Sequence, residues 1–138
     1  WDISAAALPV LRSSQQIYKG GNMPVIHTHV SVTTTPEQRE ALKNAYGEAI
    51  SILPGKSEGW LMCPFEDGMP IYFAGDDKEP AAYVEINAFG RSPVSPDTWE
   101  RLGQAVMKAV HETLGISEDR IYIRYTATAD WGWNGVNF

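Results

Sequence analysis

The same pattern of strand, helix and strand occurs twice along this chain. Each copy centres on a helix that a proline opens, with Thr35-Pro36 at one start and Ser95-Pro96 at the other. A Ser or Thr cap followed by proline at the first helical position is typical of a helix start. Apolar residues then recur at helical spacing until Pro54-Gly55 in the first copy and Gly115 in the second. This duplicated β-α-β unit constrains the fold more than any other feature.

The segments that flank the two helices have the composition of strands. Residues 25–32 and 81–89 precede the helices, and residues 60–65 and 121–126 follow them, all rich in β-branched or aromatic side chains. A helical crossover between two strands of one sheet is right-handed and leaves those strands parallel. We therefore expect an α/β domain in which two helices lie on one face of a four-stranded mixed sheet.

Two helices cover only one face of such a sheet. In residues 81–89 the even positions are small and apolar, whereas the odd positions are Tyr83, Glu85, Asn87 and Phe89. This second face is too polar for a core and too aromatic to be merely solvated. Other copies of the same chain in a closed symmetric assembly would bury it. The pattern therefore predicts a homo-oligomer.

Charge and composition exclude several classes of protein. The 138 residues carry 17 acidic and 11 basic side chains, a formal charge of -6, which disfavours binding to nucleic-acid phosphates. No apolar run approaches the roughly 20 residues that span a bilayer, so we expect no membrane partner. The single cysteine, Cys63, allows no disulfide within the chain. His27 and His29 share one strand face, but without a carboxylate or cysteine placed beside them we expect no metal.

The chain divides into two parts at Met23. Residues 1–22 show no helical or strand period, and we interpret them as an N-terminal extension, either a leader or a vector-derived segment. Residues 23–138 form the predicted domain. Removal of Met23 would give Pro24 a free α-amino group, which titrates at about 7.7 to 8.0 in peptides, within reach of a general base. Pro24 is a candidate base, although many chains begin Met-Pro and use the proline for nothing.

Candidate binding residues lie on the last predicted strand and in the loops. Tyr122 and Arg124 share a strand face, and an arginine among β-branched residues needs either an anionic ligand or an acid such as Glu85. Lys56 follows the first helix, where it interacts either with the helix dipole or with a ligand. The aromatic residues of the tail either line a pocket or pack against a neighbouring subunit: Trp131, Trp133 and Phe138.

In their order and spacing, these motifs resemble the macrophage migration inhibitory factor (MIF) family of the tautomerase superfamily. The resemblance covers residues 24–138. It is carried by Met23-Pro24-Val25-Ile26, Gly55-Lys56, Phe73-Ala74-Gly75, Glu79-Pro80, Gly115-Ile116-Ser117-Glu118-Asp119-Arg120-Ile121-Tyr122-Ile123, Gly132-Trp133-Asn134-Gly135 and the final Phe138. The resemblance implies a homotrimer that catalyses a keto-enol tautomerisation of the phenylpyruvate or D-dopachrome type, without a cofactor, at its subunit interfaces.

The resemblance also implies roles for individual residues. Pro24, as the first residue of the catalytic chain, is the general base, and Lys56 binds the carboxylate of a small aromatic or acidic keto or enol acid. Tyr122 comes from the neighbouring subunit. The apolar walls are Phe89, Trp133 and Phe138.

Two residues depart from the main branch of that family. Arg124 stands where the main branch has asparagine and the D-dopachrome tautomerase branch has arginine. A second cation beside Lys56 is expected to favour more acidic substrates. Trp131 stands where a smaller aliphatic residue is usual, which is expected to narrow the mouth of the pocket.

Two other functions stay open at this point. One is a MIF-like cytokine or immunomodulator that binds a host receptor. The other is a catalytically silent binding module, because Pro24 has only an amide nitrogen if residues 1–22 are retained. We expect the protein in the cytoplasm, or secreted without a conventional signal peptide.

Overall fold

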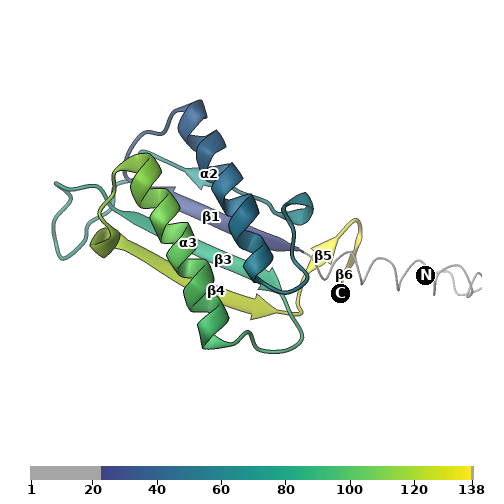
Figure 1. Cartoon of the computed structure of the whole chain (residues 1–138). Coiled ribbons are helices and arrows are strands. Elements are labelled where there is room, and N and C mark those ends of the chain that lie inside the picture. Colours follow the sequence, from purple (N-terminus) through teal and green to yellow (C-terminus); the bar gives the residue numbers. More distant parts are fainter. Residues whose placement is uncertain (1–22, 138) are drawn as a thin grey trace, which may run out of the picture.

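The computed structural model describes residues 23–137, and it confirms the two predicted β-α-β units (Figure 1). The first consists of β1 (Pro24–Val30), α2 (Pro36–Ala49) and β2 (Phe65–Glu66). The second consists of β3 (Ala82–Phe89), α3 (Pro96–Leu114) and β4 (Ile121–Thr128). Short 3-10 turns lie at Ile50–Ile52, Glu58–Trp60 and Glu118–Arg120, and a hairpin of β5 (Gly132–Trp133) and β6 (Val136–Asn137) follows β4. The predictions for residues 1–22 and Phe138 lie outside the described residues.

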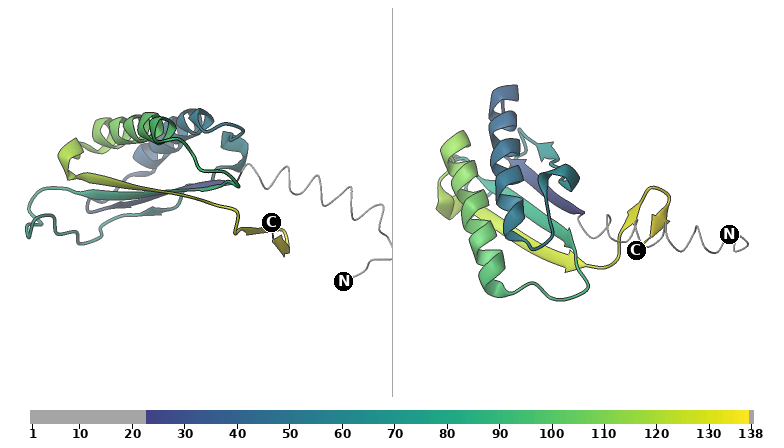
Figure 2. Two further views of the ribbon diagram at one scale, coloured as in Figure 1. Left: turned by 90° about the horizontal axis from the view of Figure 1, so that it is seen from below. Right: turned by 45° about the vertical axis from the view of Figure 1, so that its right-hand side comes forward.

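The four strands β1 to β4 form the mixed sheet that the repeat predicts. Their order is β2-β1-β3-β4, with β1 parallel to β2, β3 parallel to β4, and β1 antiparallel to β3. Both helices pack on the same face, and within the described residues the opposite face carries no helix (Figure 2). The two halves therefore meet through the central β1–β3 pair.

Local signals account for the ends of both helices. Thr35 and Gln38 form a capping box, in which the Thr35 hydroxyl accepts from the Gln38 N–H and the Gln38 side chain accepts from the Thr35 N–H. Ser95 accepts from the Thr98 N–H in the same way. Gly115 ends α3 in the left-handed conformation, with φ of 72°.

The core lies between the helices and the sheet. The even positions of β3 are buried there, as the alternation predicts, together with Leu42, Tyr46, Leu102 and Val106. The buried Tyr46 hydroxyl is satisfied by the Thr28 hydroxyl at 2.8 Å. No helix among residues 23–137 is both long and apolar enough to cross a bilayer.

The strand predicted for residues 60–65 is largely wrong. The Met62 N–H donates to the Pro24 carbonyl and the Ile26 N–H to the Met62 carbonyl, so pairing with β1 begins there. Pro64 has no N–H, and the ladder loses a rung at that residue. Regular pairing resumes only at Phe65 and Glu66. The segment before β2 is therefore a loop that follows β1 rather than a full strand.

Candidate active site

Two recesses lie at the end of the sheet where β1 begins and β3 ends. One, which we name the aromatic recess, has a volume of about 480 Å³ and is lined by Met23, Pro24, Val25, Gly59, Trp60, Leu61, Met62, Trp131, Gly132 and Trp133. The other, the cationic recess, has a volume of about 540 Å³ and includes Lys56, Ala88, Phe89 and Arg91 in its lining.

The two recesses are neighbours because the strand pairing joins their linings. Pro24 is paired with Ala88 in the antiparallel β1–β3 ladder. The Phe89 N–H donates to the Met23 carbonyl at 3.0 Å, one residue further along the same ladder. Opposite residues of such a ladder have Cα atoms about 4.5 to 5.5 Å apart. The end of the β1–β3 pair is therefore the wall between the two recesses.

Pro24 is the first residue of β1 and is buried at the edge of the aromatic recess. Met23 precedes it in the full chain, and its side chain is only 7% exposed. The nitrogen of Pro24 is then a tertiary amide, whose lone pair is delocalised into the carbonyl. The geometry brings this nitrogen to the recess, but only loss of Met23 makes it a base.

Three tryptophans supply the apolar surface of the aromatic recess. Trp60 and Trp133 meet edge to face, with ring centroids 5.1 Å apart. Asn134 and Gly135 both have positive φ, of 53° and 80°, which is the turn that an Asn-Gly pair favours between two strands. Trp133 stands at the end of β5, directly before this turn, and shares the lining of the aromatic recess with Pro24.

Trp131 adds a polar group to this otherwise apolar lining. Its indole Nε1 is buried and has no hydrogen-bond partner among residues 23–137. Buried donors normally find an acceptor, and one that does not is a position where a ligand can supply it. Trp131 thus adds a buried donor beside the flat apolar walls of the aromatic recess.

The cationic recess is built around the Phe89 ring. Phe89 is 7% exposed, so it differs from the half-buried Tyr83 and Asn87 with which the alternation groups it. The Lys56 Nζ lies 5.8 Å from the centre of this ring, and the Arg91 guanidinium lies 5.4 Å from it. Burial lowers the pKa of Lys56 from its usual range. Two cations at one ring create a positive field that suits a carboxylate.

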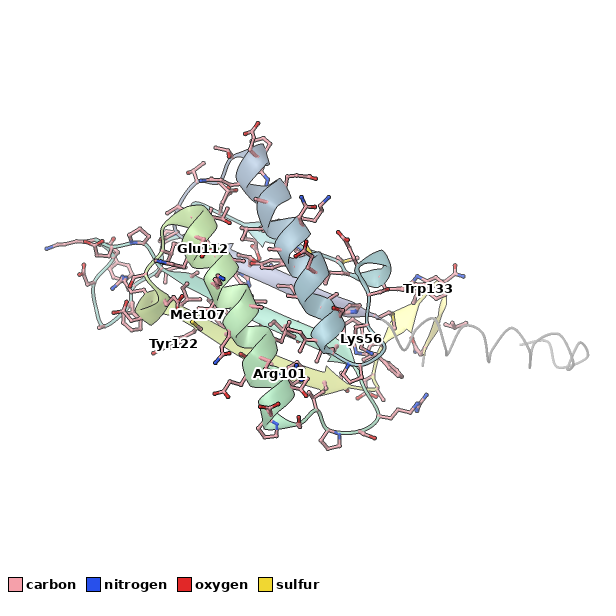
Figure 3. The ribbon with its side chains drawn as sticks, in the orientation of Figure 1. Lys56, Arg101, Met107, Glu112, Tyr122 and Trp133 are labelled. Carbon is pink, nitrogen blue, oxygen red and sulfur yellow. The ribbon has the colours of Figure 1, made fainter. Side chains whose placement is uncertain are left out.

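Tyr122 and Arg124 lie elsewhere in the same chain. Tyr122 pairs with Tyr83, five residues along β3 from the partner of Pro24, which is about 17 Å at the usual rise of a strand. Figure 3 accordingly shows Tyr122 at the opposite end of the ribbon from Lys56 and Trp133. The Tyr122 side chain is 64% exposed and contacts the Phe73 ring edge to face.

Arg124 is exposed on the same face as Tyr122, as the strand alternation predicts. Arg124 does not form an ion pair with Glu85, the alternative that the sequence left open. Glu85 instead contacts His29 and accepts from the Tyr83 hydroxyl, and no ion pair of Arg124 forms within residues 23–137. One chain therefore does not bring Tyr122 and Arg124 to Pro24.

The sequence analysis missed two residues of these recesses. Trp60 was expected to begin a strand, but it ends a 3-10 turn and packs on Trp133. Arg91 was not singled out, although its place two residues after the end of a buried strand is a typical position for a binding residue. Phe138, predicted as a wall, lies outside the described residues.

Comparison with known proteins identifies the fold. The family model for macrophage migration inhibitory factor matches residues 23–138. The MIF2 structure from Leishmania major is 36% identical with a TM-score of 0.77, over 86% of this chain and 100% of that chain. The MIF homologue from Prochlorococcus marinus is 29% identical with a TM-score of 0.73, over 83% and 98%.

More distant proteins share the fold alone. The structure of Pt0534 inactivated by 2-oxo-3-pentynoate is 17% identical with a TM-score of 0.70, over 82% of this chain and 95% of that chain. The curated proteins contain no match to this sequence. The family match spans nearly all of the described domain, and it agrees with the resemblance carried by the motifs. This chain belongs to the macrophage migration inhibitory factor family of the tautomerase superfamily.

Proposed function

We propose that this protein is a keto-enol tautomerase of the phenylpyruvate or D-dopachrome type, with the Pro24 amine as general base. One observation carries the proposal: Pro24 lies at the wall between an aromatic recess and a recess with two cations. An aromatic keto acid has a ring for the first and a carboxylate for the second. Membership of the tautomerase superfamily supports the same reaction.

The proposed reaction moves one proton within the substrate. The Pro24 amine takes the proton from the enol hydroxyl of phenylpyruvate, and the electron pair of the O–H bond forms the carbonyl. The electron pair of the C=C bond then forms a C–H bond at the carbon beside the ring, with the proton of the resulting ammonium. Lys56 binds the carboxylate, and the tryptophans hold the ring. The product is an isomer of the substrate, so the reaction consumes no oxidant or reductant.

The proposal requires that the catalytic chain begins at Pro24. A free amine beside Lys56 and Arg91 would be surrounded by positive charge and partly desolvated, and both effects lower an amine pKa toward neutrality. Under this proposal residues 1–22 are an extension that is removed together with Met23. The enzyme then acts in the cytoplasm or after secretion, and a receptor-binding role stays a prediction.

We further propose that the complete site forms in a homotrimer. Tyr122 and Arg124 are exposed and belong to β4, an edge strand of the sheet, displaced along the strand from the level of Pro24 by about 17 Å and about 10 Å respectively. A neighbouring copy can bring its own Tyr122 and Arg124 to Pro24, and it would also cover the face without helices. Mixing inactive Pro24→Ala chains with Tyr122→Phe chains, after joint refolding, is expected to restore activity in the mixed trimers. A protein that runs as one chain in light scattering would contradict the trimer.

Covalent labelling tests the role of Pro24. The reagent 2-oxo-3-pentynoate, which inactivates Pt0534, is a keto acid whose alkyne accepts addition of an amine. The chain that begins at Pro24 is expected to gain one reagent mass on its N-terminal peptide and to lose activity in proportion. Phenylpyruvate should protect it. Labelling confined to Cys63, or activity that survives labelling of Pro24, would overturn the assignment.

A catalytically silent binding module is the second candidate. It is favoured by one observation, since the Met23 carbonyl is already integrated in the β1–β3 ladder through the Phe89 N–H. A chain that keeps this peptide bond folds with both recesses but has no basic nitrogen at Pro24. Mass spectrometry of the protein purified from its source cells decides between the two forms, because it gives the N-terminal residue directly.

A further inference from the structure

The sheet face without helices carries a compact group of imidazoles and carboxylates, away from the two recesses. His27 and His29 are alternate residues of β1 and point to this face. The register places Glu66 of β2 beside His29, and Glu85 of β3 beside His27. Three strands thus contribute to one cluster, which we name the histidine cluster: His27, His29, Glu66 and Glu85.

Three atoms of this cluster converge on one point. The Glu66 Oε2 lies 2.7 Å from the His27 Nε2 and 3.3 Å from the His29 Nδ1. The two imidazole rings are stacked, with centroids 4.0 Å apart and planes inclined by 29°. Ligating atoms of the two histidines and Glu66 all lie within 4.8 Å of one another. Two imidazole nitrogens and a carboxylate oxygen therefore lie close enough together to share one ion.

This donor set is one that zinc prefers. Zinc sites with two histidines and one glutamate keep a fourth position for water or another ligand. Bonds of about 2.0 to 2.1 Å place neighbouring ligand atoms of a tetrahedral ion about 3.3 Å apart. The distance from Glu66 to His29 already has this value, and the distance from Glu66 to His27 is about half an ångström shorter.

The remaining carboxylate has the place of an outer partner. The Glu85 Oε1 lies 3.3 Å from the His29 Nε2, the nitrogen on the far side of the ring from Glu66. Glu85 is held in turn by the Tyr83 hydroxyl, which donates to its Oε2 at 3.2 Å. Carboxylates that accept from the distal N–H of a ligating histidine fix the tautomer whose other nitrogen binds the metal. With Nε2 as the donor, Nδ1 is the unprotonated nitrogen of His29, and it lies 3.3 Å from the Glu66 Oε2.

We propose that His27, His29 and Glu66 bind a divalent transition-metal ion of the zinc class, supported by Glu85. The sequence prediction of no metal rested on the lack of a carboxylate beside the two histidines. The structure places one there from β2, 37 residues after His29 in the chain. The ion would tie β2, which has only two ladder pairs, to the centre of the sheet. This proposal is independent of the proposed tautomerase activity.

Metal uptake by the full chain tests the site. The protein is treated with EDTA, dialysed, and titrated with Zn²⁺ in a calorimeter, with Co²⁺ absorption as a second readout. We expect one ion per chain and the intense visible bands of four-coordinate Co²⁺. Thermal unfolding should shift upward in Zn²⁺, and hydrogen exchange should slow in residues 61–66, since the metal holds the folded state.

Matched variants identify the ligands. His29→Gln and Glu66→Gln are expected to abolish stoichiometric uptake, and Glu85→Gln to weaken it by about tenfold, the usual effect of losing an outer partner. His111→Gln removes the third and last histidine of the chain and should bind as the wild type does. Cys63→Ser should also bind normally, because burial raises the pKa of this thiol to about 11 and keeps it protonated.

Two results would overturn the proposal. One is a wild-type protein that takes up no Zn²⁺ and whose thermal unfolding does not shift in Zn²⁺. The histidines and glutamates would then be linked by hydrogen bonds alone. The other is uptake that persists in the His27→Gln/His29→Gln double variant. Because Glu66 is half exposed, Glu66→Gln is expected to fold, and its circular dichroism shows whether a loss of binding reflects the site rather than unfolding.

Discussion

The two β-α-β units share one plan and differ in regularity. In the second unit α3 has 19 residues and β3 pairs with β4 over eight consecutive residues. In the first unit α2 has 14 residues and passes into the 3-10 turn at Ile50–Ile52, and the β1–β2 ladder has two pairs. Gly115 gives α3 a left-handed end, whereas Pro64 removes a rung from the shorter ladder.

The difference shows how one repeated unit supplies both a scaffold and a site. The irregular backbone of the first unit places Lys56 and Trp60 in loops at the recesses. The regular second unit holds Tyr122 and Arg124 on β4, which is paired with β3 along its whole length. Loops on a rigid scaffold are the usual location of binding residues, and strands give more exact positions for residues offered to a neighbour. Substitutions in both units test this difference.

The largest expected effect is on the shared core. Leu42 of α2 and Leu102 of α3 are both fully buried against the sheet. Replacing either by alanine is expected to lower the free energy of unfolding by about 2 to 5 kcal/mol, because each leaves a cavity between helix and sheet. Urea unfolding of Leu42→Ala and Leu102→Ala measures both. A cost below 1 kcal/mol for Leu42→Ala alone would show that the first unit is loosely packed.

Lys56 of the first unit and Arg124 of the second are expected to differ in their effect on kcat/KM. Lys56→Ala should lower kcat/KM for phenylpyruvate by about 10- to 100-fold, which corresponds to one charge-assisted hydrogen bond to the carboxylate. Arg124→Asn should change kcat/KM for phenylpyruvate little. It should lower kcat/KM more for a keto acid with a second carboxylate.

Arg101→Ala is the matched control for that loss of charge. Arg101 lies on the outer surface of α3 and pairs with Asp97 (Figure 3), and its removal should leave kcat/KM for both substrates unchanged. If Arg124→Asn lowers kcat/KM equally for both substrates, Arg124 does not make the enzyme prefer the substrate with two carboxylates. Steady-state kinetics of the chain that begins at Pro24 gives all of these ratios.

Two buried glycines, one in each helix, are expected to respond to substitution with opposite sign. A Cβ on Gly103 of α3 would collide with the Tyr125 hydroxyl, which is held against Trp99, whereas a Cβ on Gly47 of α2 would meet only the side chain of exposed Glu58. Gly103→Ala should therefore destabilise by about 1 to 3 kcal/mol. Gly47→Ala should stabilise by about 0.5 to 1 kcal/mol, since alanine favours a helix. Destabilisation by both variants would show that Glu58 cannot swing away.

Stability is also expected to depend on pH through Cys63 of the first unit. Burial raises the pKa of this thiol to about 11 from an ordinary value of 9.0. Between these values the unfolded chain loses the proton and the folded chain keeps it, so stability falls as pH rises from 9 to 11. Cys63→Ala should remove that part of the decline. Equal pH dependence of both proteins in urea unfolding would show that Cys63 is not the cause.

The sequence predicts those features that short segments determine. The caps at Thr35 and Ser95, the ends of α3 and the alternation of β3 each depend on a few neighbouring residues, and the structure confirms them. The parallel pairs follow from the handedness of the crossovers. The strand prediction for residues 60–65 was largely wrong. Pro64 has no N–H to donate to β1, and the sequence alone does not show which strand lies beside this residue.

The site was harder to predict because its residues meet across the sheet. Glu66 reaches His29 only through the register of β2 on β1, and Arg91 reaches Phe89 only through the turn after β3. Nothing local to Glu66 marks it, and Arg91 is marked only by its place after the end of a buried strand. The roles of Pro24, Lys56, Tyr122 and Arg124 came from a family resemblance, and they stay predictions until the activity is measured.

The most direct test of the account compares phenylpyruvate tautomerisation by two forms of the protein. One form begins at Pro24, and the other keeps residues 1–23 and therefore an amide at the same nitrogen. The account predicts activity in the form that begins at Pro24 and none above the uncatalysed rate in the longer form. Equal activity in both forms would contradict it, because another group would then transfer the proton.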